Sequence, residues 1–185
     1  YLCIAADAGL KNAQTLGIRV SVVVGDFDSL GARPRVDSDV EVIAAPAEKD
    51  ETDTQLAVHE AVKRGADEIV IIGGLSGRLD HTLSNLAILE SLCEHRIGAY
   101  ITDGRNRARF VKNDSLLIAN EGFRYLSLIA VDEKCRGVSV EGCKYPLANA
   151  TLHRKNQYAV SNEIEGNCAL VEIKRGGVWI IESND

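Results

Sequence analysis

The pattern of apolar residues changes near residue 104 of this 185-residue chain, and that change limits the folds it can adopt. Before it, short apolar runs alternate with amphipathic stretches; after it, only short runs with a period of two follow, separated by turn signals. Alternating strands and helices are typical of a parallel α/β sheet with helices on both faces, and period-two runs of an antiparallel sheet. The sequence therefore predicts a Rossmann-like α/β domain over residues 1–105 and an antiparallel β-sandwich or barrel over residues 106–185.

The first domain is expected to hold five strands and three helices. Thr52 and Gln55 have the spacing of a capping box, which marks the start of the second helix. Residues 31–39 fit either a helix or a loop. The expected strands span 2–6, 20–24, 40–45, 69–72 and 99–102, and the helices span 10–16, 52–65 and 79–94. The second domain is expected to form strands over 107–111, 115–119, 125–130, 137–140, 158–161, 169–174 and 178–182.

Two aspartates follow the most apolar of these strands. Three consecutive valines at 22–24 are typical of a buried strand, Gly25 ends it, and Asp26 and Asp28 come next. Residues two apart in an extended chain point to the same side, so both carboxylates can face one small volume. A Mg²⁺ ion would offset their mutual repulsion there. The alternative is an ordinary acidic turn in which Asp28 caps a helix.

A second acidic group lies at the start of the second helix. The segment Lys49-Asp50-Glu51-Thr52-Asp53 places three carboxylates and one ammonium around the first turn. In one interpretation Asp53 binds metal together with Asp50, and Lys49 binds a phosphate. In the other, these acids cap the helix and compensate its dipole.

A glycine-rich loop joins the fourth strand to the third helix. It runs Gly73-Gly74-Leu75-Ser76-Gly77-Arg78 and lacks the ending of a Walker A motif. Glycines let the backbone approach an anion, and Arg78 can bind phosphate oxygens through two N–H groups. Asp80 and His81 open the helix, with Asn85 one turn beyond His81 on the same face. Such loops also serve as packing turns, and His81 also fits a helix-start polar residue.

These acidic and glycine-rich segments all follow predicted strands. Ligands of parallel α/β sheets bind beyond the carboxyl ends of the strands. Asp7 follows the first strand, so it is expected to lie at the same sheet edge as the groups described above. In the second domain, Ser161-Asn162-Glu163 interrupts an apolar run, either as a hairpin turn or as a lip that hydrogen-bonds a small organic substrate. Trp179 is expected in the core.

Composition excludes several classes of protein. The net charge of −6 and the pI of about 5.3 argue against electrostatic binding of nucleic acid. The sequence has no signal peptide and no run of about 18 apolar residues, so neither export nor membrane insertion is expected. Five cysteines without a CxxC pair predict reduced thiols and a cytoplasmic location. A β-module of this size often needs a neighbour to bury its second face, which favours a dimer.

Taken in order, these motifs resemble the thiamine pyrophosphokinases of the bacterial type. The matching segments, which span nearly the whole chain, are Asp7-Ala8-Gly9, Gly25-Asp26-Phe27-Asp28-Ser29, Lys49 to Asp53, Gly74 to His81 with Asn85, and Tyr145-Pro146-Leu147 with Ser161-Asn162-Glu163. The resemblance implies a homodimer with active sites at the subunit interface. It also implies transfer of an intact pyrophosphoryl group from ATP to the thiamine hydroxyl, giving thiamine diphosphate and AMP.

The resemblance further implies roles for single residues. Asp26, Asp28 and Asp53 would hold Mg²⁺, and the catalytic groups would be Asp28, Arg78 and Asp80. Contacts with ATP or its phosphates are expected from Asp7, Lys49, Gly74, Ser76, Gly77, Arg78, His81 and Asn85, and contacts with thiamine from Asp50, Ser161 and Asn162. Ser161 and Asn162 would face the catalytic domain of the partner subunit. The opening strand and Gly-rich turn of the family would precede Tyr1, so we expect further residues there.

Two other functions are compatible with the same residues. A Mg²⁺-dependent nucleotide phosphohydrolase would use the acidic cluster with water as the nucleophile, and would release phosphate from nucleotide alone. A nucleotide-binding module without turnover would bind ATP and form no product. The products formed from ATP in the presence and absence of thiamine distinguish all three functions.

Overall fold

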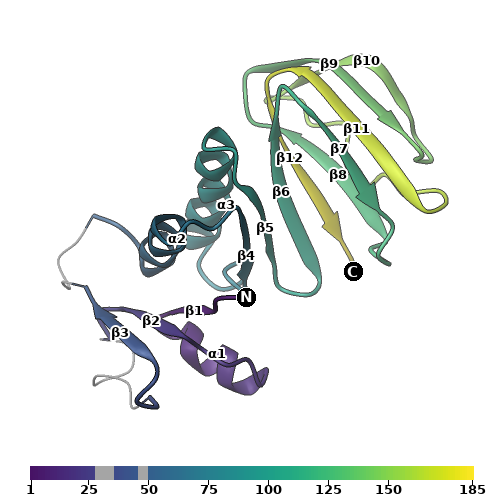
Figure 1. The fold of residues 1–185 in the computed structure, drawn as a ribbon. Coiled ribbons are helices and arrows are strands. Elements are labelled where there is room, and N and C mark those ends of the chain that lie inside the picture. Colours follow the sequence, from purple (N-terminus) through teal and green to yellow (C-terminus); the bar gives the residue numbers. More distant parts are fainter. Residues whose placement is uncertain (28–35, 46–49) are drawn as a thin grey trace. The chain divides into compact units, whose positions relative to one another are not determined.

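The structure is a computed structural model, and it describes residues 1–27, 36–45 and 50–185. These residues form two compact units, Tyr1–Ile69 and Val70–Asp185, which are considered separately (Figure 1). The predicted domain boundary at residue 105 lies inside the second unit.

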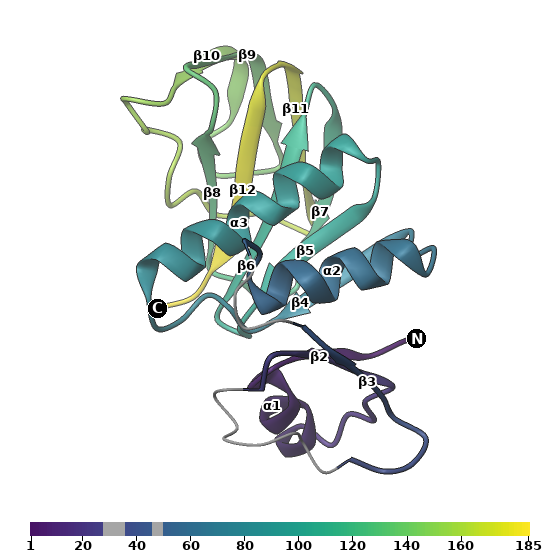
Figure 2. The ribbon, with the colours of Figure 1, turned by 90° about the vertical axis from the view of Figure 1, so that its left-hand side faces the viewer.

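The first unit is built, within the described ranges, on a three-stranded parallel sheet. Its strands are β1 (Ile4–Ala6), β2 (Val22–Gly25) and β3 (Glu41–Ala44), with β2 in the centre. The helices α1 (Gly9–Thr15) and α2 (Asp53–Lys63) lie on opposite faces of this sheet (Figures 1 and 2). The predicted parallel sheet with helices on both faces is therefore confirmed for these strands.

The valines of β2 explain this arrangement. Val23 packs with Leu10 and Ala13 of α1, whereas Val22 and Val24 point to the opposite face and are also buried. On that opposite face α2 contacts β1 and β2. A central strand that is apolar on both sides is what a parallel sheet covered by helices requires.

The second unit contains one helix and two sheets. The helix is α3 (Leu79–Glu94). The five-stranded sheet runs β4 (Glu68–Ile72), β5 (Gly98–Thr102), β6 (Asn106–Lys112), β12 (Gly177–Ser183) and β8 (Tyr125–Ala130). The four-stranded sheet runs β10 (Leu147–His153), β9 (Lys134–Glu141), β11 (Cys168–Arg175) and β7 (Ser115–Ala119).

The five-stranded sheet is the middle layer of this unit. Alternate residues of β12 face its two sides: Val178 and Ile180 join the core shared with the four-stranded sheet, and Trp179 packs against the cluster beneath α3. Leu86 and Leu89 of α3 supply the helix side of that cluster. The second part of the chain is thus rich in β-strands, as the period-two pattern predicts.

The prediction that the fourth and fifth strands continue the parallel sheet is not confirmed. In the five-stranded sheet, β5 pairs with β6 antiparallel, with Thr102 opposite Arg107. A tight turn joins the two strands, in which Asp103 Oδ1 accepts hydrogen bonds from the backbone N–H groups of Arg105 (2.9 Å) and Asn106 (2.7 Å). This local turn favours the hairpin over a crossover connection.

A strand predicted over residues 158–161 is also absent, and β10 was not predicted. The 158–161 segment runs beside β8 with single contacts, such as Leu128 N to Ala159 O at 2.7 Å. Ser161 ends it in a left-handed backbone conformation, with φ of 57°, which breaks a regular ladder. In β10, register shifts and a positive φ at Asn149 disturb the period of two. No helix in the part of the chain that the structure describes is long and apolar enough to span a bilayer.

Candidate active site

In the first unit, Asp7 and the carboxylate of Asp53 both lie beside Gly25. A Cβ atom on Gly25 would lie 3.2 Å from Asp7 Cβ and 3.5 Å from Asp53 Oδ1. A side chain at this position would therefore fill the space that separates the two acids. The structure thus brings Asp7 and Asp53 to the carboxyl end of β2, and Asp26 is the next residue of the chain.

Local backbone structure fixes each of these acids. Asp7 has a left-handed φ of 41°, and its N–H donates to Val24 O at 2.8 Å, which ties the end of β1 to β2. Asp53 begins α2 directly after a capping box. Thr52 N–H donates to Gln55 Oε1 at 2.8 Å, and Gln55 N–H donates to Thr52 Oγ1 at 3.2 Å. The predicted capping box is confirmed, and it fixes the backbone at the helix start from which the Asp53 side chain reaches Gly25.

Phe27 anchors the backbone next to Asp26, a role that no sequence motif indicated. Its φ is 64°, a conformation that aromatic residues rarely adopt, and its side chain is buried beside Leu10 and Ala13 of α1. Strain of this kind persists only where the surrounding packing enforces it. A bulky residue directly after two polar or flexible positions was the available sequence signal.

The carboxylate groups around Gly25 are of the kind that binds a magnesium ion. In the described ranges, no group of three or more His, Cys, Asp or Glu side chains is arranged to hold a metal ion. Mg²⁺, however, is commonly bound by one or two carboxylates together with substrate phosphates and water, and Asp53, Asp7 and Asp26 supply such hard oxygen donors. The predicted residues Asp28 and Lys49 lie outside the described residues, and Asp50 is exposed.

In the second unit, the side chain of Asn85 hydrogen-bonds the backbone of the predicted phosphate loop. The glycines at 73, 74 and 77 all have positive φ values, of 90°, 76° and 87°. Buried Asn85 donates from Nδ2 to Gly74 O at 3.0 Å, and a Cβ on Gly74 would lie only 2.6 Å from that nitrogen. Asn85 thus holds the loop backbone, while Ser76 and Gly77 are exposed.

Replacing Gly74 with alanine should destabilise the protein by about 1–3 kcal/mol more than replacing Gly73 with alanine. Both variants share the cost of a positive φ. Only the Gly74 variant also displaces Asn85 and breaks its buried hydrogen bond, whereas Gly73 has open space for a Cβ. Urea unfolding curves measure the difference. Equal losses in the two variants would show that Asn85 does not constrain the loop.

Arg78 and Asp80, at the start of α3, bind each other. Arg78 Nη2 donates to Asp80 Oδ2 at 2.5 Å and Nε donates to Oδ1 at 3.1 Å, and Oδ1 also accepts the N–H of His81 at 2.9 Å. The hydrogen bond from Arg78 lowers the pKa of the Asp80 carboxyl below its usual value. Arg78, Asp80 and His81 are all exposed, so the guanidinium can exchange its partner for a phosphate without burying the carboxylate.

Farther along the second unit, Asn162 is buried and its amide atoms bind backbone. Its Oδ1 accepts the N–H groups of Tyr145 and Glu163, each at 2.9 Å, and its Nδ2 donates to Tyr145 O at 2.8 Å. Ser161 is exposed, and its N–H donates to Ser127 Oγ at 3.0 Å. The structure therefore gives Asn162 a scaffolding role, which leaves direct contact with thiamine as a prediction.

Comparison with known proteins places this arrangement in a family. A family model described as "Thiamin pyrophosphokinase, catalytic domain" matches residues 1–101, which is more than half of the chain. The chain belongs to the thiamine pyrophosphokinase family. A second family model, "Thiamin pyrophosphokinase, vitamin B1 binding domain", matches residues 115–178. The two matches lie on either side of residue 105, and the predicted boundary there remains a prediction.

Individual relatives agree with this assignment. The thiamine pyrophosphokinase of Bacillus subtilis (strain 168) is 31% identical over 193 residues, covering 100% of this chain and 88% of the relative. The crystal structure of thiamine pyrophosphokinase from Bacillus subtilis matches with a TM-score of 0.88 and 28% identity, over 100% of this chain and 88% of that one. A thiamin pyrophosphokinase family protein from Enterococcus faecalis matches with a TM-score of 0.84 and 30% identity, over 98% and 88%.

Family membership fixes the class of activity. Thiamine pyrophosphokinases are ATP-dependent diphosphotransferases, and this chain is an enzyme of that class. The phosphohydrolase and the non-catalytic binding module are not favoured by any of these matches. The residues of the Gly25 junction and of the glycine loop all lie inside the range that the catalytic-domain model covers.

Proposed function

We propose that this enzyme transfers the pyrophosphoryl group of ATP to the hydroxyl of thiamine, giving thiamine diphosphate and AMP. The observation that carries the proposal is the match of the catalytic-domain family model to residues 1–101, which contain both the Gly25 junction and the glycine loop. In the reaction, the hydroxyl oxygen forms a bond to the β-phosphorus. The bond from that phosphorus to the α,β-bridging oxygen breaks, and the hydroxyl proton is released.

The metal ligands in this proposal are Asp26 and Asp53, together with Asp28. Bound there, Mg²⁺ would neutralise charge on the phosphate oxygens. The capping box and the buried Phe27 hold Asp53 and the Asp26 loop, so their carboxylates are positioned before the nucleotide arrives. Preorganised positioning of this kind supplies much of the rate in phosphoryl transfer, where the protein has little covalent chemistry to perform.

The phosphates of ATP are assigned to the glycine loop and Arg78. Positive φ values at the glycines keep the loop backbone open to an anion, and the guanidinium can bind two phosphate oxygens at once. Further nucleotide contacts are proposed for Asp7, Lys49, Gly74, Ser76, Gly77, His81 and Asn85. Of these, Asn85 acts through the loop that it supports.

Asp80 orients the thiamine hydroxyl rather than deprotonating it in the ground state. Its bond to Arg78 lowers its pKa, which makes the carboxylate a weak base. When Arg78 turns to a phosphate, that effect is lost and the basicity of Asp80 rises. Exchange of the guanidinium would thus couple nucleotide binding to activation of the hydroxyl.

We also propose which residues bind thiamine, how the subunits assemble and where in the cell the enzyme works. Asp50, Ser161 and Asn162 are assigned to the thiamine side. A homodimer with active sites at the subunit interface and a cytoplasmic location also belong to the proposal.

The product test is incubation with ATP, Mg²⁺ and thiamine, followed by ³¹P NMR and anion-exchange chromatography. AMP and thiamine diphosphate should form in equal amounts, and only when thiamine is present. Release of inorganic phosphate without thiamine would show a phosphohydrolase instead. Binding of ATP with no product under any condition would show a binding module.

A further inference from the structure

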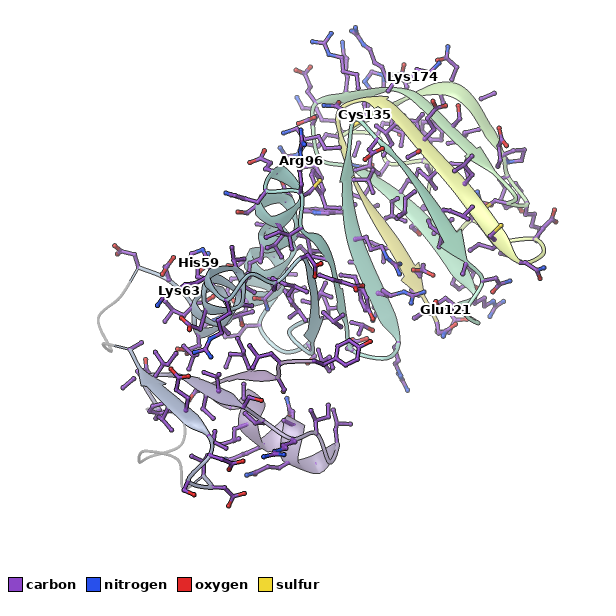
Figure 3. All side chains as sticks on the ribbon, in the orientation of Figure 1. His59, Lys63, Arg96, Glu121, Cys135 and Lys174 are labelled. Carbon is purple, nitrogen blue, oxygen red and sulfur yellow. The ribbon has the colours of Figure 1, made fainter. Side chains whose placement is uncertain are left out.

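One end of the four-stranded sheet is rich in basic side chains. The start of β9 and the ends of β10 and β11 meet there, because both neighbours of β9 run antiparallel to it. Figure 3 labels Lys174 at this end. Two exposed acids, Glu133 and Glu172, lie in the same segments. The exposed basic residues, together called the basic end, are Lys134, Arg136, Arg154, Lys155, Lys174 and Arg175.

The basic end lacks the ion pairs that are common elsewhere in the second unit. Within the described ranges, no side-chain nitrogen of these six residues lies within 4.0 Å of a carboxylate oxygen. Six of the eight other Lys and Arg residues of this unit do form ion pairs, namely Arg78, Arg107, Arg109, Lys112, Arg124 and Lys144. The fold therefore leaves the positive charge of the basic end uncompensated.

Two of these charges lie opposite each other in the sheet. Arg136 of β9 is paired with Arg175 of β11, and the Cβ atoms of residues paired in this way are about 4.5–5.5 Å apart. Like charges at paired positions destabilise a sheet. Two neighbouring guanidinium groups can, however, share one anion, because each presents two N–H groups to phosphate oxygens. The pair is thus unfavourable alone and favourable around a phosphate.

Gly137 holds the side chain of Lys174 beside this pair. Gly137 has a left-handed φ of 65°, and the register between β9 and β10 shifts at this point. A Cβ atom on Gly137 would lie only 2.7 Å from Cβ and Cδ of Lys174, so the aliphatic part of the lysine lies against the glycine. A lysine held in this way loses less conformational freedom when its ammonium group binds a ligand.

We propose that Arg136, Lys174 and Arg175, with Lys134 beside them, bind a short polyphosphate, that is, an anion of two or more linked phosphate groups. This site shares no residue with the glycine loop and Arg78, to which the proposed function assigns ATP. Charges on neighbouring strands, about 4.8 Å apart, fit several phosphates better than one.

The net charge of the chain favours a short anion over a large one. A nucleic acid or an anionic membrane extends past the basic end and is repelled by the rest of a chain whose net charge is −6. A short anion experiences mainly the charges within one Debye length, about 8 Å at physiological salt. It therefore gains the attraction of the basic end without that repulsion.

Isothermal titration calorimetry with tripolyphosphate tests this site. The Arg78→Gln protein is used throughout, so that phosphate binding at the glycine loop is weakened. Adding Arg136→Gln or Arg175→Gln should weaken tripolyphosphate binding about tenfold or more. Gly137→Ala keeps every charge and should also weaken it, because the new Cβ displaces Lys174. The control is Arg124→Gln, which removes an exposed arginine that already pairs with Asp185 and should leave binding unchanged.

Thermal unfolding gives a second readout, in which the same variants act in the opposite direction. Without polyphosphate, Arg136→Gln and Arg175→Gln should each raise Tm by about 1–2 °C, because they remove a like-charge contact. Tripolyphosphate should raise the Tm of the parent protein and have little effect on these two variants. A pair that served only the fold would lose stability when either arginine is replaced.

Further ligands separate this site from general attraction of negative charge. Binding within twofold of the parent in both Arg136→Gln and Arg175→Gln would overturn the proposal. Citrate binding as tight as tripolyphosphate binding would also overturn it, as would tighter binding of RNA or of vesicles containing phosphatidylserine. ATP binding that is lost in the same two variants would support the site and identify a nucleotide as the source of the polyphosphate. Loss of tripolyphosphate binding alone would support the site with free polyphosphate as its ligand.

Discussion

Replacement of Asp26 by asparagine is expected to lower turnover with ATP, Mg²⁺ and thiamine by about 10²- to 10³-fold while leaving the fold intact. Asparagine keeps the size of the side chain and removes its negative charge. A metal ligand of this type contributes several kcal/mol of charge stabilisation in the transition state, and each 1.36 kcal/mol corresponds to a tenfold change in rate. The backbone beside Asp26 is held by the buried ring of Phe27, which the substitution leaves in place.

Initial rates of AMP formation measure this effect, and Asp67→Asn is the matched control. Asp67 is an exposed residue of the same unit and lies before β4, away from the carboxyl ends of the parallel strands. The control should keep wild-type activity, and circular dichroism melts should show both variants folded. Higher Mg²⁺ concentrations should restore part of the Asp26→Asn rate. Activity within a few-fold of wild type at ordinary Mg²⁺ would rule out Asp26 as a metal ligand.

Local features of the fold were predictable because short sequence patterns determine them. The bounds predicted for α3, 79–94, agree with the structure, and the capping box at Thr52 forms as expected. Strand partners were less predictable, since the apolar pattern of a strand does not reveal which neighbour it pairs with. The strand over 98–102 fits a parallel sheet equally well by composition, and the turn at Asp103 decides for the hairpin with β6.

The sequence predicted the positions of the site residues better than it predicted their roles. Sequence motifs located Asp7, Asp26 and Asp53, and the structure brings the first and last of these together at Gly25. Motifs could not separate ligand-binding amides from scaffolding amides, because both types lie beside glycines and acids. Asn85 and Asn162 were predicted to contact ligands, and their amide groups hold backbone segments in the structure. Their roles in ligand binding remain predictions.

The charged network around Glu182 was not predicted, because its members are far apart in the sequence. Glu182 is 1% exposed and lies opposite Arg107 across the β6–β12 pair. Arg107 donates to it through Nε at 2.8 Å and Nη2 at 2.7 Å, and Arg109 donates to the same carboxylate. Arg107 also binds Glu121 at 2.5 Å and lies 4.8 Å from the ring of Phe123. Figure 3 labels Glu121 at the end of the sandwich opposite Cys135 and Lys174.

Replacement of Glu182 by glutamine is expected to destabilise the second unit by about 3–5 kcal/mol, because it leaves two buried or half-buried arginines without their central counter-charge. The matched control is Glu121→Gln, which removes a carboxylate from the same arginine at a position that is 55% exposed. Solvent already screens that pair, so the loss should be no more than about 1 kcal/mol. Urea unfolding followed through the fluorescence of Trp179, the single tryptophan of the chain, reports on this unit.

A second comparison separates the burial of an unpaired charge from simple loss of contacts. Replacing Arg107 and Arg109 by methionine and Glu182 by leucine together should recover much of the stability that Glu182→Gln loses, because apolar side chains of similar volume need no counter-charge. Recovery would assign the cost to desolvated arginine rather than to packing. Equal losses in Glu182→Gln and Glu121→Gln would instead show that water reaches the whole network, and that the buried carboxylate contributes no more than a surface ion pair.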